Sequence, residues 1–118
     1  MWPFSGRYPN DIEKRAPGVL AIVKNVAENA NFPPNYRFGN AYEVIQEKVG
    51  GDCDDFITET YQIPSVTSEI GTYDQFINAW VIKSKEQALD IVRLNSNWVD
   101  YIFLNLPKFA FQLQSAKK

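Results

Sequence analysis

The stretch Gly50-Gly51-Asp52-Cys53-Asp54-Asp55-Phe56 joins two predicted helices and decides how we expect this chain to fold. Apolar residues over 41–49 recur at helical spacing, and the two glycines end that helix because glycine accepts a left-handed cap without strain. Asp52 is a good N-cap for the next helix, which continues until Pro64 stops it. The sequence therefore predicts that Cys53 lies at a helix N-terminus, directly after a sharp turn.

The part of the chain before this stretch is also predicted to be helical. A first helix begins at Asn10 or Asp11, whose side chains can cap free N–H groups, and Pro17-Gly18 interrupts it. Apolar side chains at helical spacing predict a second helix over 19–29. The paired prolines within 32–35 remove backbone donors and disfavour helical geometry before them, so a loop is expected there.

The part of the chain after this stretch contains strand signals. Residues 65–70 alternate with period two and residues 76–82 are rich in strand formers, so both are predicted to be antiparallel strands. Residues 85–94 return to helical spacing. Residues 98–104 predict a third strand, with a helix that continues up to Pro107 as the alternative. The expected fold class is α+β, with N-terminal helices packed on a small antiparallel sheet.

Length and composition indicate one folded domain. The chain has 118 residues, 45% of them hydrophobic, and a formal charge of −2. We expect a single domain over 1–118, with an irregular aromatic arm at 1–10 and a tail at 108–118. Scattered cations predict no nucleic-acid binding. The chain has no apolar run long enough to span a bilayer and no recognisable secretion signal, so a cytoplasmic or virion-associated location is expected.

Cys53 is the only cysteine, which excludes an intrachain disulfide and a cysteine-rich zinc site. A helix N-terminus favours the reactive thiolate, whereas the flanking aspartates disfavour it. The chain has no histidine, the usual base in cysteine catalysis. Asp52, Asp54, Asp55 and Glu59 lack the spacing of an EF-hand loop, so they predict a capped helix start without a metal. We expect no cofactor.

The sequence Gly-Asp-Cys-Asp-Asp-Phe at 51–56, followed by Ala-Trp-Val at 79–81, resembles motifs of the transglutaminase-like superfamily of cysteine enzymes. That family includes small bacterial and phage members that look like cysteine peptidases. The resemblance covers roughly 42–81. It implies a reduced papain-like core in which Cys53 is the nucleophile.

The resemblance also shows what this chain lacks. The family's basic histidine stands just before Ala-Trp-Val, where this chain has Asn78, and an amide cannot accept a proton at neutral pH. Asp100 is a weak candidate for the third member of the triad, and Asp90 has similarly awkward spacing. Gln46 is a weak candidate for an oxyanion donor. The motif therefore predicts a dismantled active site.

The sequence thus favours a non-catalytic binding or structural module, a pseudoenzyme that serves as a small component of a phage or other multi-protein assembly. We expect a protein partner or a homo-oligomer, contacted through the arm and the tail. The alternative is an acyltransferase or peptidase centred on Cys53, with its base supplied by a partner, by substrate or by Asp74. A third interpretation is a plain α+β domain whose motif matches by chance.

Overall fold

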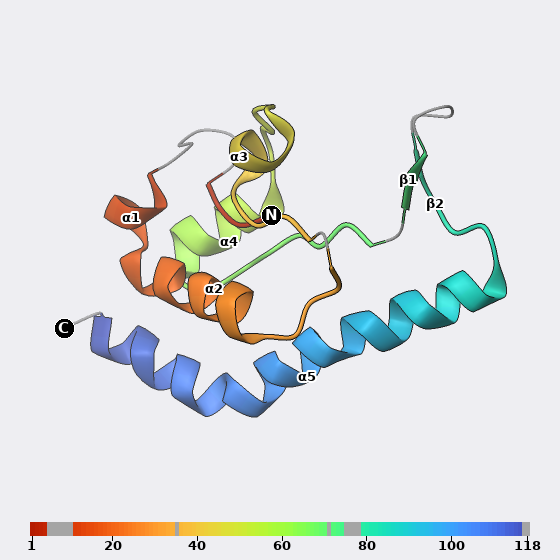
Figure 1. The fold of residues 1–118 in the computed structure, drawn as a ribbon. Coiled ribbons are helices and arrows are strands. Elements are labelled where there is room, and N and C mark those ends of the chain that lie inside the picture. The colour runs from red at the N-terminus through yellow and green to blue at the C-terminus, as the bar shows by residue number, and fades with distance from the viewer. Residues whose placement is uncertain (5–10, 35, 71, 75–78, 117–118) are drawn as a thin grey trace.

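The computed structural model describes residues 1–4, 11–34, 36–70, 72–74 and 79–116, and these residues are predominantly helical (Figure 1). In chain order the elements are α1 (Ile12–Arg15), α2 (Pro17–Asn29), α3 (Ala41–Ile45), α4 (Cys53–Tyr61), β1 (Thr72–Asp74), β2 (Ala79–Val81) and α5 (Lys85–Ala116). The expected α+β fold is wrong. Within the described ranges the only strand pairing is that of β1 with β2, and the helices pack on one another instead of on a sheet.

The break between α1 and α2 follows from a proline. Ala16 adopts φ −146° and ψ 60°, outside helical geometry, and Pro17 takes the first position of α2. Proline disfavours helical geometry in the residue before it but suits a first helical turn, where its missing N–H costs nothing. The predicted interruption at this point is confirmed.

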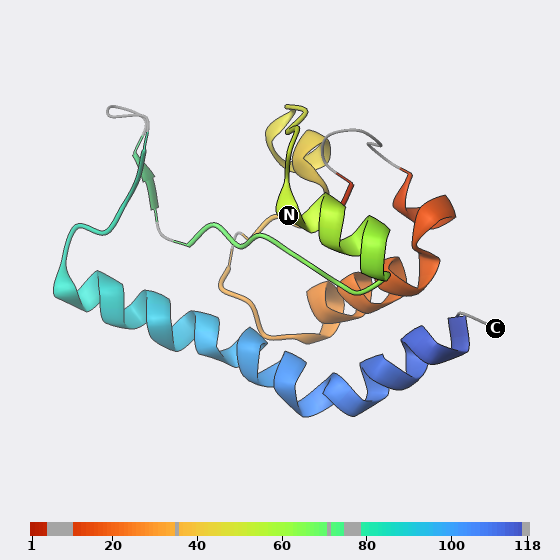
Figure 2. The same ribbon diagram turned by 180° about the vertical axis from the view of Figure 1, so that it is seen from behind.

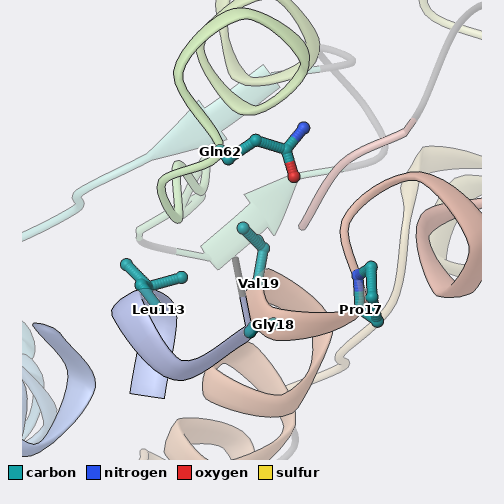
Figure 3. Close-up of a pocket in the computed structure, with 6 residues that line it drawn as sticks. Pro17, Gly18, Val19, Gln62 and Leu113 are labelled. Atoms are coloured by element: carbon teal, nitrogen blue, oxygen red, sulfur yellow. The ribbon is translucent and has the colours of Figure 1, made fainter. Parts of the chain in front are cut away.

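Helices α2 and α5 form the central packing of the fold. Gly18 permits the closest approach, because a Cβ on this residue would lie 3.0 Å from Cβ of Ala116. Figure 3 shows Gly18 beside Leu113, with Gln62 reaching over the same point from the end of α4. The pocket left there holds only about 40 Å³, roughly one water. Further along, the Tyr101 hydroxyl donates to Oδ1 of Asn25 at 3.0 Å and ties the two helices together.

The hydrophobic core lies between α1, α2 and the first residues of the chain. Phe4 is 1% exposed and contacts the apolar side of α2, where Val19 and Leu20 are buried. The Trp2 N–H donates to the carbonyl oxygen of Gly39 at 2.8 Å. The described part of the predicted arm, 1–4, is therefore built into the core, and residues 5–10 lie outside the described part.

The helix expected over 41–49 is shorter than predicted. It begins with a capping box, in which Asn40 and Glu43 each accept from the other's backbone N–H. It ends at Ile45. The next residue, Gln46, takes the left-handed conformation that the sequence predicted for the glycine pair. The glycine pair instead belongs to the irregular link to α4.

Of the three predicted strands, only that over 76–82 contains a strand, β2, and its antiparallel partner is β1 and not residues 65–70. Residues 65–70 contain no strand, and the segment after α4 runs extended toward the hairpin (Figure 2). Strand β2 pairs with β1 in the register Tyr73 to Trp80, and residues 75–78 lie outside the described part. Residues 98–104 are helical, because α5 continues through Pro107 to Ala116 and bends in its second half (Figures 1 and 2). Residues 108–116 of the expected tail are the last turns of this helix.

Candidate functional site

Cys53 is the first residue of α4, as predicted, and its side chain is exposed. The Asp52 side chain caps the helix by accepting from the Asp54 N–H at 3.0 Å. The Cys53 thiol donates to Oδ1 of Asp54, with 4.0 Å between Sγ and that oxygen.

Asp54 is the centre of this region. Its carboxylate is 4% exposed and accepts from two hydroxyls, Ser65 Oγ on one oxygen at 2.5 Å and Thr67 Oγ1 on the other at 2.6 Å. Thr67 in turn pairs with Met1, whose amino group donates to the Thr67 carbonyl oxygen and whose carbonyl oxygen accepts the Thr67 N–H. Hydrogen bonds of the Cys53 motif thus join α4, the segment at 65–67 and the chain start.

The amino group of Met1 shows how enclosed this junction is. Burial lowers its pKa from the ordinary value of 8.0, and the negative charges of Asp54, Glu69 and Asp52 partly oppose that shift. Such a desolvated cation is tolerated because acidic groups surround it.

The other predicted site residues are not assembled around Cys53. Asp100 and Asp90 are exposed residues of α5, and Asp90 accepts from Nη2 of Arg93 at 3.1 Å. Gln46 is the exposed C-cap of α3. Asn78 lies outside the described residues, and of Asp74 only the place in β1 is described. The hairpin projects beside the start of α5, away from α4 (Figures 1 and 2).

The acidic groups around Cys53 come close enough to face one another. One ligand atom from each of Asp52, Cys53 and Asp54 lies within 4.8 Å of the others. Oδ1 of Asp52 and both oxygens of Asp54 already accept hydrogen bonds, however. A bound cation would have to compete with these bonds, so the arrangement is that of a helix cap and a polar junction.

The structure contains a second feature that the sequence did not indicate, an apolar groove of about 850 Å³ between α2 and α5. Residues of both helices line it, together with residues of the chain start, the 32–39 segment, α3 and the 63–69 segment. Apolar side chains dominate the lining, among them Trp2, Val26, Phe38, Ile63, Ile102 and Leu106. This volume falls within the range of about 300–1,000 Å³ that small-molecule sites occupy.

An aromatic cluster builds one wall of the groove. Phe32 stacks on Trp98 with ring centroids 5.4 Å apart and an interplanar angle of 13°, and Phe38 meets Phe32 edge-on at 4.7 Å. Asn95, which is 8% exposed, fixes this wall: its Oδ1 accepts from the Tyr36 hydroxyl at 2.6 Å and from Nε1 of Trp98 at 2.8 Å. The loop at 32–38 is thereby held on α5.

The polar groups of the groove are few. The Ser68 hydroxyl oxygen is buried and has no hydrogen-bond partner among the described residues, and Ser68 lines the groove. Charged groups of Arg37, Glu69 and Met1 also belong to lining residues, Met1 through its amino group. The sequence did not indicate this site, because the residues around Trp98 predicted a strand; the aromatic residues around Pro33-Pro34 were the available signal.

Compared with known proteins, the chain matches no protein-family model, no curated protein and no solved structure. The transglutaminase-like resemblance therefore rests on the sequence motifs alone, and the fold does not supply the sheet that it implies. Among the described helices, none combines the length and apolarity that crossing a membrane requires.

Proposed function

We propose that this protein is a non-catalytic binding module that holds an apolar small molecule in the groove between α2 and α5. The observation that carries the proposal is the groove itself, about 850 Å³ of largely apolar space walled by stacked aromatic rings. A concave, mostly apolar space of this size with a few polar groups is typical of small-molecule sites. Burial of apolar ligand surface supplies the binding free energy, at about 25 cal/mol per Å².

The polar groups of the groove restrict the ligand. Charges of both signs belong to the lining residues Arg37, Glu69 and Met1, so the lining does not select a strongly charged molecule. The Ser68 hydroxyl, for which the described residues offer no partner, can donate or accept one hydrogen bond. The ligand that fits has an apolar body and one hydrogen-bonding group. An amphiphile of this kind would satisfy the serine and cover the aromatic wall at the same time.

A binding role agrees better than catalysis with the surroundings of Cys53. The chain has no histidine, and the Asp54 carboxylate beside the thiol is engaged by Ser65 and Thr67. A general base must lie within hydrogen-bond reach of the proton that it removes and be free to accept it. The carboxylate at this site serves structure instead.

A neutral fluorescent probe tests the proposal. We expect N-phenyl-1-naphthylamine to bind with enhanced fluorescence and to quench Trp2 and Trp98, which both line the groove. Ala27→Phe places a ring in the groove from α2 and should weaken probe binding about tenfold or more. Ala21→Phe is the matched control, because Ala21 lies exposed on the same helix outside the lining. Equal probe affinity in the two variants would refute the groove as the site.

The hydrogen-bonding group is tested with a ligand pair, 1-naphthol and naphthalene. The normal protein should prefer the hydroxylated member, and Ser68→Ala should reduce that preference by about fivefold, the value of one hydrogen bond. If Ser68→Ala weakens both compounds equally, the serine has no part in selecting the ligand.

A further inference from the structure

The outward face of α5 exposes large apolar side chains. Phe103 is 65% exposed, Leu104 82% and Phe111 70%. At 3.6 residues per turn these three side chains lie within about 100° of one another around the helix. The α5 residues that line the groove, such as Trp98 and Phe109, lie on the opposite side. The outward face is therefore a separate surface from the ligand groove.

The charges on this face are placed so that they would pair with those of a second copy running in the opposite direction. Asp100, Leu104 and Lys108 stand at four-residue intervals, so they form one row along the helix. Both charged residues are exposed, and neither has an ion pair or hydrogen bond within the described part of the chain. They are about 12 Å apart along the axis, too far to pair with each other.

A second copy of α5, laid antiparallel across a two-fold axis at Leu104, satisfies this row. Such an axis places Leu104 against its equivalent, and each Asp100 against Lys108 of the other copy. A two-fold interface of this kind uses the same patch on both subunits. The convex side of the bent helix faces away from α2, which leaves this part of α5 accessible (Figures 1 and 2).

The area is sufficient for a weak, specific interface. With about 150–250 Å² for a covered aromatic side chain, the three apolar residues expose roughly 400 Å² per chain. Two copies then cover roughly 800 Å² of apolar surface, to which the flanking polar residues add. Specific interfaces bury about 1,200–2,000 Å² in total, so this pairing lies at the weak end. We propose that the protein self-associates through antiparallel α5 pairing centred on Leu104.

Charge reversal tests the register of this pairing. Asp100→Lys and Lys108→Asp each turn two attractive contacts into two repulsive ones, and each should weaken dimerisation about tenfold or more in analytical ultracentrifugation. The double variant Asp100→Lys/Lys108→Asp should recover the dimer. An equimolar mixture of the two single variants should form a heterodimer, because its opposed charges are again complementary.

Matched controls make the result specific. Glu86→Lys and Lys85→Asp make the same charge changes in the exposed first turn of α5, at least 18 residues from Leu104, and should leave dimerisation unchanged. Leu104→Arg should give a monomer with unaltered far-UV circular dichroism. A protein that stays monomeric at millimolar concentration, or a dimer insensitive to both single reversals, would overturn the inference. Probe binding in the groove is independent of either result.

Discussion

The start of α4 and the groove beside α5 differ in whether their side chains have partners within the fold. At the start of α4 the buried Asp54 carboxylate meets two hydroxyls, and Asp52 caps the helix. In the groove, apolar side chains face open space and the Ser68 hydroxyl has no partner among the described residues. The cysteine and aspartates, residue types that often take part in catalysis, therefore lie at a structural junction. The candidate binding site is instead marked by apolar side chains and a hydroxyl that have no partner among the described residues. Four changes would test this contrast.

The largest effect is expected from Asp54→Ala. This variant removes the acceptor of two buried, charge-assisted hydrogen bonds and leaves two hydroxyls unpaired, which should cost about 3 kcal/mol in the free energy of unfolding. Urea denaturation measures that cost. Asp90→Ala, which removes an exposed carboxylate of α5, is the control and should cost less than about 0.5 kcal/mol. A near-equal loss in both variants would show that the junction is not structural.

Asn95→Ala should have the next largest effect and act on both stability and binding. It removes the oxygen that accepts from Tyr36 and Trp98, so we expect a loss of about 2 kcal/mol and weaker probe binding as the aromatic wall loosens. Asn97→Ala, two residues along α5 at an exposed position, should change neither. Normal probe affinity in Asn95→Ala would show that the aromatic wall does not contribute to probe binding.

Cys53→Ser should have a smaller effect on stability than either of these variants. The thiol is exposed, so the substitution should change the free energy of unfolding by less than about 0.5 kcal/mol and leave probe affinity unaltered. Iodoacetamide should label the normal thiol no faster than free cysteine at the same pH, because the chain has no histidine to act as its base. Much faster labelling would indicate that Cys53 is a reactive nucleophile.

The smallest effect concerns the Met1 amino group. Because burial lowers its pKa below 8.0 in the folded state, the unfolded chain binds more protons in the interval below pH 8. Stability should therefore rise slightly with pH across that interval and level off above pH 8. Urea titrations of the amino-acetylated protein should lack this rise. A stability that falls with pH there would contradict the burial of the amino group.

Local signals in the sequence were sufficient for the starts of several helices, although not for the ends of α3 and α5. Pro17 marks the start of α2, and the Asp52 cap places Cys53 at the first position of α4. These features depend on backbone geometry within one or two turns, which residue identity constrains directly. The same local reasoning failed at 98–104, where aromatic and β-branched residues predicted a strand. Strand propensity reflects packing against neighbours more than backbone preference, so a helix that offers those contacts overrides it.

The sequence by itself thus determined where helices begin, that one cysteine stands without a histidine, and that a carboxylate-rich turn surrounds it. Only the tertiary structure decided what these groups do. The partners of Asp54 stand 11 and 13 residues away, and Tyr36 reaches Asn95 across 59 residues. The groove exists because α2, α5 and two irregular segments enclose a common space, a relation between distant parts of the chain that periodicity and motif spacing do not encode.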